Sequence, residues 1–321
     1  MGIRVAILGA GTMGHALALV YALGGHEVRL TDSSMSTLDK AGALMEAALA
    51  SLVVNEEVEE SHTADWLHAN VTRLPTLAET LEDADLIVEA IIENPDAKRT
   101  LYAELDRTAP MEAVIASNTS YLDPFPLIPD RRQPRALVMH WYTPPYLVDL
   151  VDIVAGPRCE PEIVEWARDL VARMGKVPLV MRKFVPGYVA NRVQSAIMAE
   201  VYGLIDEGVA TAEEIDTAVI HGLALRMPVV GVMAKADFTG LAIQQNALRN
   251  ATYQPPAPRN DSPTLDGLIA QGRTGVMAGA GYYDWTTEPG KLFAARDARL
   301  IALKRAMREI GTMAGATRVR G

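Results

Sequence analysis

The feature that most constrains this chain is a set of three spaced glycines, Gly9, Gly11 and Gly14, placed directly after the apolar segment 4–8. The segment RVAIL is typical of a buried strand, and residues 15–23 have the apolar pattern of a helix. A strand, a glycine turn and a helix in this order begin a doubly wound α/β sheet and form its phosphate-binding turn. We therefore expect a Rossmann domain at the N-terminus.

Each glycine has its own expected role. Gly9 permits the tight turn, Gly11 lets a pyrophosphate approach the backbone, and Gly14 lets the helix and strand pack closely. Thr12 and Met13 lie in the same turn and are assigned to the cofactor site with the glycines. The helix N-terminus adds free N–H groups and a partial positive charge that favour a phosphate group.

An acidic residue, Asp32, ends the second predicted strand at 27–31, about 20 residues beyond the glycines. A carboxylate there accepts hydrogen bonds from the ribose hydroxyl groups and repels a 2′-phosphate. The next residues are Ser33 and Ser34, and no arginine follows directly. The pattern favours NAD over NADP, although FAD uses the same glycine fingerprint and stays open on this motif alone.

The length of 321 residues suits two domains. Further predicted strands cover residues 86–90, 113–116, 136–139 and 177–180. A largely helical excursion is expected over residues 34–81, and helical periodicity dominates after the breaker cluster 184–187. The prediction is an α/β fold with a doubly wound Rossmann sheet over residues 1–184, followed by an all-helical domain over residues 185–321.

Composition excludes several classes of function. The net charge of −10 argues against a nucleic-acid partner and against an anionic membrane surface. The chain has one cysteine, Cys159, which rules out an internal disulfide framework and a cysteine-rich metal site. No metal-ligand cluster, targeting segment or membrane-spanning segment is visible in the sequence, so we expect a cytoplasmic protein without a metal.

One of the six histidines stands out by its position. His140 follows the predicted strand 136–139 and precedes a rigid turn at residues 143–145. Ligands bind at the carboxyl ends of strands in an open α/β sheet, and an imidazole suits the proton transfer that accompanies hydride transfer. From spacing alone, His140 is equally a candidate base and a hydrogen-bonded structural histidine.

The chain resembles the L-3-hydroxyacyl-CoA dehydrogenase family over essentially its full length. The segments that carry the resemblance are GAGTMG (9–14), VEAIIEN (88–94), ASNTS (116–120), HWYTPPYLVDLVDIV (140–154), VPGYVANR (185–192), the DEGVAT and EEIDTA stretch (206–218) and GRTG with GAGYYDW (272–285). Their order and spacing also match. The length looks closest to the branch that contains lambda-crystallin, an L-gulonate 3-dehydrogenase.

The resemblance implies a role for each matching polar residue. His140 becomes the general base in oxidation, and Ser117 and Asn191 hold the substrate oxygen. The family has a glutamate twelve positions beyond the histidine, whereas this chain has Asp152, which is one methylene shorter. Asn191 is also a good helix cap, and Ser117 also suits a turn, so both keep a structural alternative.

Further matching residues are assigned to the cofactor. Glu93 and Lys98 match residues that line the nicotinamide ribose region in the family. Ala90 and Asn118 lie in the same matched segments and are assigned to the cofactor site with them.

Two departures from the family concern the substrate. The chain has no lysine or arginine between Ala41 and Thr72, where CoA-using relatives carry basic residues, and it has five acidic side chains in residues 56–65 instead. Arg226 stands where those relatives have a GYPMGP-like turn, and a guanidinium group suits a free carboxylate. A surface arginine that ends a helix remains the structural alternative.

These observations favour NAD-dependent oxidation of a small 3-hydroxy carboxylic acid to the 3-oxo acid, with hydride transfer to NAD. The main alternative is a 3-hydroxyacyl-CoA dehydrogenase of the 3-hydroxybutyryl-CoA type. A non-catalytic NAD-binding or structural protein is the alternative from another class. The helical domain is expected to form a homodimer, as in the family.

Overall fold

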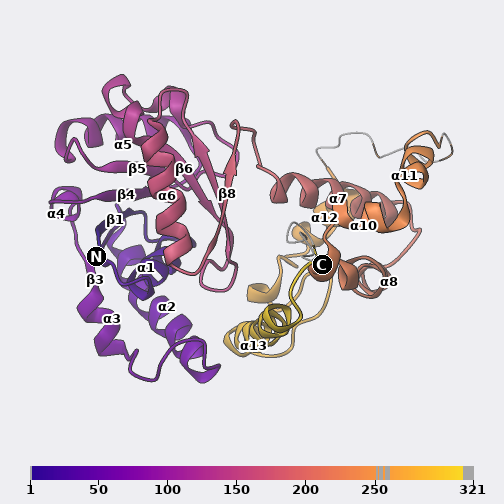
Figure 1. Cartoon of the computed structure of the whole chain (residues 1–321). Coiled ribbons are helices and arrows are strands. Elements are labelled where there is room, and N and C mark those ends of the chain that lie inside the picture. The colour runs from indigo at the N-terminus through magenta and orange to yellow at the C-terminus, as the bar shows by residue number, and fades with distance from the viewer. Residues whose placement is uncertain (1, 251, 253–255, 257–260, 314–321) are drawn as a thin grey trace. The chain divides into compact units, whose positions relative to one another are not determined.

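The chain forms two compact units, Met1–Ala190 and Asn191–Gly321. The computed structural model describes residues 2–250, 252, 256 and 261–313 (Figure 1). The first unit holds the sheet, and the second unit is built from helices. The predicted fold class, a Rossmann domain followed by a helical domain, is therefore confirmed.

The sheet of the first unit has eight strands in the order β3-β2-β1-β4-β5-β6-β7-β8. Their bounds are β1 Arg4–Leu8, β2 Glu27–Thr31, β3 Val71–Arg73, β4 Leu86–Glu89, β5 Val114–Ser117, β6 Ala136–Trp141, β7 Leu150–Ala155 and β8 Val177–Met181. All neighbouring strands are parallel except β6 and β7, which pair antiparallel. The strand order reverses between β1 and β4, which is where ligands bind in folds of this class.

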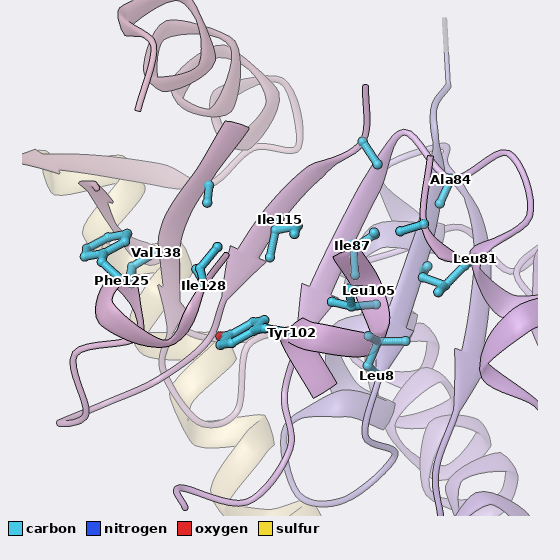
Figure 2. Close-up of a cluster of buried hydrophobic side chains, with 14 of the residues drawn as sticks. Leu8, Leu81, Ala84, Ile87, Tyr102, Leu105, Ile115, Phe125, Ile128 and Val138 are labelled. Atoms are coloured by element: carbon cyan, nitrogen blue, oxygen red, sulfur yellow. The ribbon is translucent and has the colours of Figure 1, made fainter. Parts of the chain in front are cut away.

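Helices cover both faces of this sheet. Those of the first unit are α1 Gly14–Leu23, α2 Met35–Val54, α3 Ala64–Asn70, α4 Leu77–Leu81, α5 Pro95–Thr108 and α6 Pro161–Arg173, with 3₁₀ turns at Phe125–Leu127 and Asp130–Arg135. On the face that α5 covers, Leu8, Ile87, Ile115 and Val138 pack with Tyr102 in a continuous apolar layer (Figure 2). Helix α6 packs against β7 and β8 (Figure 1). The edge of the sheet that faces the ligand therefore rests on a rigid core.

Helix starts in this unit follow local chemistry. The Ser34 side chain accepts a hydrogen bond from the backbone N–H of Thr37 at the start of α2. The Asn94 side chain accepts from the N–H groups of Asp96 and Ala97, and Pro95 occupies the first turn of α5. These caps satisfy N–H groups that have no partner within the helix.

Two strands went undetected in the sequence. Strand β3 lies inside the segment 34–81 that was expected to be largely helical, and it has only three residues at the edge of the sheet. Strand β7 follows the turn after His140 and pairs antiparallel with β6, which a strictly alternating strand–helix reading does not allow for. The pairing places Asp152 directly opposite His140.

The boundary between the units falls later in the chain than the predicted 184/185. Residues 185–190 belong to the first unit, because Tyr188 is fully buried within its core. The helices of the second unit are α7 Ala190–Asp206, α8 Ala212–Ala218, α9 Met227–Val230, α10 Met233–Thr239, α11 Leu241–Leu248, α12 Pro263–Ala270 and α13 Pro289–Ile310, with shorter turns at Val219–Leu223, Ala224–Arg226 and Val276–Ala278.

Across the part of the chain that the structure describes, no single helix has both the length and the apolar composition needed to cross a membrane. One bent pair, Ala212–Val230 with Met233–Thr239, meets the test by length and composition only.

Candidate active site

The glycine turn lies between β1 and α1, and its three glycines are needed for different reasons. Gly9 has a φ of 99°, and a Cβ atom on it would lie 2.6 Å from the backbone oxygen of Ala90. A Cβ atom on Gly14 would lie 1.6 Å from the backbone oxygen of Gly9. A Cβ atom on Gly11 would meet nothing within 4 Å. The chain itself therefore requires Gly9 and Gly14, whereas Gly11 faces open space that a ligand can enter.

Asp32 connects the end of β2 to this turn. Its Oδ2 atom accepts a hydrogen bond from the backbone N–H of Ala10 at 2.8 Å, and its Oδ1 atom accepts from the N–H of Ser34 at 2.8 Å. The carboxylate is thus fixed beside the glycine turn, where it also borders the pocket described next. This is the placement that a ribose-binding carboxylate requires.

A pocket of about 900 Å³ runs along the carboxyl ends of the central strands. It includes most of the residues that the sequence assigned to the cofactor, namely Gly9, Gly11, Thr12, Met13, Asp32, Ala90, Glu93 and Asn118. Ser120 and Tyr121 line it as well. An open glycine turn and a fixed carboxylate in one long pocket fit the pyrophosphate and ribose of a dinucleotide.

Glu93 organises the loop that follows β5. Its Oε1 atom accepts hydrogen bonds of 2.8–3.0 Å from the Thr119 hydroxyl group and from the backbone N–H groups of Ser120, Tyr121 and Leu122. Burial opposes ionisation, but these donors and the Lys98 ammonium group outweigh it and lower the pKa of Glu93 to about 2. The charged carboxylate therefore holds residues 119–122 in one conformation.

Glu89 is the centre of a buried polar network beneath the pocket. Its carboxylate accepts from the Lys98 ammonium group at 2.7 and 2.8 Å, from the Tyr102 hydroxyl group at 2.8 Å and from the Ser117 hydroxyl group at 2.6 Å. Lys98 also lies 3.4 Å from Glu93, so it connects this network to the loop above. Ser117 and Lys98 are both buried and occupied by these contacts, and neither borders the pocket.

The imidazole of His140 lies near the end of β6 and has a polar partner on each nitrogen. Nδ1 is 3.3 Å from Oδ2 of Asp152 on β7, and Nε2 is 3.2 Å from Oγ of Ser120. A carboxylate can only accept a hydrogen bond, so Nδ1 carries the hydrogen and donates it to Asp152. Nε2 is then the acceptor nitrogen of the neutral ring. Ser120 lines the cofactor pocket, so Nε2 of His140 contacts a residue of that pocket.

Aromatic rings enclose this imidazole. The rings of Tyr142 and Tyr188 each lie 4.6 Å from the His140 ring, centre to centre. Trp141 is buried and packs 5.6 Å from Tyr21 of α1, so it belongs to the core. Tyr142, and not the neighbouring Trp141, is therefore the aromatic side chain that contacts the imidazole.

The hydroxyl group that contacts the His140 imidazole belongs to Ser120, and the predicted role of Ser117 at the substrate oxygen stays a prediction. Both serines lie in the segment ASNTS, but Ser117 is the last residue of β5 and points its hydroxyl group at Glu89. Ser120 lies in the loop beyond the strand end, which is where ligand-binding residues gather in this fold. Asn118, between them, accepts a hydrogen bond from the backbone N–H of Trp141 at 2.9 Å.

Asn191 and Arg226 belong to the second unit. Asn191 is the second residue of α7, and Arg226 ends a 3₁₀ turn before α9. Arg226 lines a pocket of about 320 Å³ together with Lys235 of α10 and apolar side chains that include Met227 and Leu241. Among the described residues, the guanidinium group of Arg226 and the ammonium group of Lys235 have no hydrogen-bonding or ion-pair partner.

A pocket lined by a phosphate-binding glycine turn and by a serine that contacts an imidazole fits the class of an NAD-dependent oxidoreductase acting on CH–OH groups. Comparison with protein families agrees with this class. The NAD-binding domain of 3-hydroxyacyl-CoA dehydrogenase matches residues 4–184, and the C-terminal domain of the same enzymes matches residues 187–285. The chain belongs to the 3-hydroxyacyl-CoA dehydrogenase family and uses NAD. The lambda-crystallin branch stays a prediction.

Similar proteins include enzymes with different substrates. The chain is 31% identical to 5-formyl-3-hydroxy-2-methylpyridine 4-carboxylate 5-dehydrogenase of Mesorhizobium japonicum, over 94% of this chain and 97% of that one. It is 33% identical to L-carnitine dehydrogenase of Nocardiopsis dassonvillei, over 95% and 92%. It is also 30% identical to the mitochondrial hydroxyacyl-coenzyme A dehydrogenase of Rattus norvegicus, over 88% and 91%.

Solved structures similar to this chain also include enzymes named for different substrates. The crystal structure of 5-formyl-3-hydroxy-2-methylpyridine 4-carboxylic acid 5-dehydrogenase, described as an NAD⁺-dependent dismutase, aligns with a TM-score of 0.84 at 28% identity and covers 96% of this chain and 99% of that one. The (S)-3-hydroxybutyryl-CoA dehydrogenase from Ralstonia eutropha aligns with a TM-score of 0.68 at 26% identity and covers 89% and 100%.

Proposed function

We propose that this chain oxidises the 3-hydroxyl group of a small 3-hydroxy acid whose carboxylate is free, with His140 as the base. The single observation that carries the proposal is the contact between Nε2 of His140 and Oγ of Ser120, at the end of the cofactor pocket. A substrate hydroxyl group placed within hydrogen-bonding distance of both atoms has an acceptor for its proton and a donor for its oxygen.

The proposed roles follow from this arrangement. Nε2 of His140 takes the proton of the substrate hydroxyl group, and Asp152 stabilises the imidazolium that forms at Nδ1. Bound NAD would supply the acceptor for the hydride that leaves the carbon carrying the hydroxyl group. Ser120 donates a hydrogen bond to the oxygen as it becomes a carbonyl, and Asn191 is proposed, from the family resemblance, as a second donor. Ser117 acts indirectly, by satisfying the Glu89 carboxylate beneath the pocket.

The absence of basic residues over residues 41–72 supports a substrate without a CoA group. This segment forms most of α2 and all of α3, and its acidic residues Glu56, Glu59, Glu60 and Asp65 are exposed. Such a surface repels the phosphates of CoA. Two similar enzymes are named for small substrates, a pyridine 4-carboxylate and L-carnitine, that carry a free carboxylate group.

Arg226 is proposed as the partner of that carboxylate. Its pocket has apolar walls and a second cation, Lys235, and a guanidinium group binds a carboxylate through two parallel hydrogen bonds. An apolar surround strengthens such a contact because water screens it less.

A 3-hydroxyacyl-CoA substrate is the second candidate. It is favoured by the similarity to the rat mitochondrial hydroxyacyl-coenzyme A dehydrogenase and to 3-hydroxybutyryl-CoA dehydrogenase of Clostridioides difficile. The two candidates differ in the group next to the reacting carbon chain, which is a free carboxylate in one and a thioester in the other.

The test compares free 3-hydroxy acids with 3-hydroxyacyl-CoA thioesters by following NADH absorbance. We expect turnover of at least one free acid, a loss of about 100-fold or more in kcat/KM for Arg226→Ala on that acid, and near-complete loss for His140→Gln. Efficient turnover of acetoacetyl-CoA that Arg226→Ala leaves unchanged would contradict the free-acid proposal. NADH formation that is insensitive to His140→Gln would contradict the assignment of the base.

We also propose that the helical unit forms a homodimer. It exposes large apolar side chains on successive helices, among them Phe238, Ile243 and Leu248. A twofold partner can cover such faces. Sedimentation equilibrium is expected to give twice the chain mass of 34.7 kDa, and a concentration-independent monomer would contradict this.

A further inference from the structure

One carboxylate oxygen near the proposed base has two partners. Oδ2 of Asp152 lies 3.3 Å from Nδ1 of His140 and accepts a hydrogen bond from the Tyr142 hydroxyl group at 2.6 Å. Asp152 is completely buried, and its Oδ1 atom has no hydrogen-bonding partner among the described residues. The tyrosine contact is therefore the shorter of the two contacts made by this carboxylate.

The geometry points to Tyr142 as a positioning residue, whose hydroxyl group holds Asp152 against His140 and stabilises the buried negative charge. This inference rests on the proposed role of His140 as the base. The family resemblance implies a glutamate at position 152, and the aspartate side chain is one methylene shorter. A hydroxyl donor that holds the aspartate carboxylate in place compensates in part for its shorter side chain.

The proton of this hydrogen bond belongs to the tyrosine. Burial, followed by the hydrogen bond to Asp152 and the charge of that carboxylate, raises the pKa of Tyr142 above its usual value. The phenol therefore remains a donor across the pH range in which an enzyme of this kind is assayed. Tyr188 provides a contrast, because its ring also contacts the imidazole while its hydroxyl group donates to the backbone oxygen of Thr119 at 2.6 Å.

Several titratable groups act on the two tyrosines that contact this buried pair. Besides Tyr142 and Tyr188, the ionisable side chains whose charges act on these two tyrosines are those of Tyr121, Glu93, Asp123 and Asp152 itself. Strand β8, which pairs with β7 on its other side, carries no titratable residue. Helix α6 packs against β7 with apolar side chains, and its charged side chains are exposed.

The direction of the expected effect follows from the charges. With a neutral imidazole the pair has a net buried charge of −1, and with an imidazolium its net charge is zero. The strand pairing of His140 with Asp152 keeps the carboxylate beside the imidazole when the Tyr142 hydroxyl group is removed. That hydroxyl group stabilises the negative state, so its removal makes the pair bind a proton more readily. A base that is protonated at higher pH loses activity at neutral pH and regains it in more alkaline solution.

The experiment measures kcat/KM against pH for wild type and Tyr142→Phe, which keeps the ring and removes the hydroxyl group. We expect the low-pH limb of the profile to move to higher pH by about one unit. At pH values on that limb, kcat/KM should therefore fall about tenfold. The KM for NAD should stay unchanged. Tyr188→Phe is the matched control, because it removes a phenol hydroxyl group next to the same imidazole but not from Asp152, and its low-pH limb should not move.

A double-mutant cycle with Asp152→Glu tests the positioning role directly. The longer glutamate reaches His140 with less support, so Tyr142→Phe should cost less in that background than with Asp152. Equal losses in both backgrounds, or an unmoved low-pH limb in Tyr142→Phe, would overturn the inference.

A readout without catalysis separates this inference from the proposed function. NMR titration of the histidine ring protons, with the His140 signal identified by its absence in His140→Gln, should show His140 protonating at higher pH in Tyr142→Phe. That shift in a protein without dehydrogenase activity on any tested acid supports the inference and rejects the proposed function. Coincident His140 titration curves for wild type and Tyr142→Phe reject the inference whatever the activity.

Discussion

The Oγ atom of Ser120 lies 3.2 Å from Nε2 of His140, although the two residues come from different strand ends. Ser120 keeps this position because Glu93 binds the backbone N–H groups of its loop. The His140 imidazole is therefore positioned from two sides, by Asp152 at Nδ1 and by a loop that a charged side chain holds at Nε2.

The two serines of the segment ASNTS are expected to respond differently to alanine substitution. Ser120→Ala removes the donor beside the base, so kcat should fall about 100-fold with little change in stability. Ser117→Ala leaves the buried Glu89 carboxylate short of one donor, so the free energy of unfolding should fall by about 1–3 kcal/mol. Steady-state kinetics and urea unfolding on both variants check this. A larger kcat loss for Ser117→Ala than for Ser120→Ala would restore Ser117 to the position beside the substrate.

Glu93 should make a pH-dependent contribution to stability. Its pKa lies at about 2 in the folded chain, below the ordinary value of 4.5. The contribution is therefore fully present above pH 4.5 and is lost as the pH falls towards 2. Glu93→Gln should lower the free energy of unfolding at pH 7, and the difference from wild type should shrink over that acid range.

Urea unfolding at a series of pH values measures this difference. Glu60→Gln serves as the control, since Glu60 is exposed and lies outside the loop contacts. If the free energy of unfolding of Glu93→Gln differs from that of wild type by the same amount from pH 7 to pH 3, the role of this carboxylate in holding the loop is contradicted.

Much of the fold could be predicted because its local signals agree with its tertiary structure. The runs at β1, β4, β5 and β6 are short, apolar and buried, and those at β2 and β8 are short and only partly buried, yet the local pattern located all six. Strand β3 has three residues and takes its structure from pairing with β2, which no local pattern reveals. The boundary moved past residue 184 because Tyr188 packs in the first unit, and burial at that level is a property of the assembled core.

The candidate site could be predicted only where sequence position determines geometry. Gly9 and Asp32 follow directly from the strand–turn–helix pattern, and both line the pocket. The choice between Ser117 and Ser120 depends on which way each hydroxyl group points after β5 ends, and a motif of five residues does not specify that direction. The contact between Tyr142 and Asp152 depends on the antiparallel pairing of β6 and β7, which the sequence did not reveal.

Asp32 is expected to set the preference between NAD and NADP. Its carboxylate borders the pocket beside the glycine turn, where the 2′-phosphate of NADP would meet a like charge. Asp32→Asn removes this repulsion, so the ratio of the NADPH and NADH dissociation constants should fall by about tenfold or more. Fluorescence titration with both reduced cofactors measures the ratio, and Asp65→Asn, an exposed acidic residue at the start of α3, is the control. An unchanged ratio in Asp32→Asn would show that the adenosine ribose lies elsewhere.

Alanine substitutions at Gly11 and Gly14 are expected to have different effects. The first should weaken cofactor binding, and the second should destabilise the protein. An added methyl group on Gly11 meets no protein atom within 4 Å, so Gly11→Ala should fold with nearly wild-type stability. The same methyl group fills the space through which the pyrophosphate reaches the turn, so NADH affinity should fall by about 100-fold. On Gly14 the methyl group would lie 1.6 Å from the Gly9 carbonyl oxygen, which forces the backbone apart and should cost at least about 3 kcal/mol of unfolding free energy. Thermal unfolding and NADH titration of both variants distinguish the effects, and a Gly11→Ala protein that binds NADH as tightly as wild type would place the pyrophosphate away from this turn.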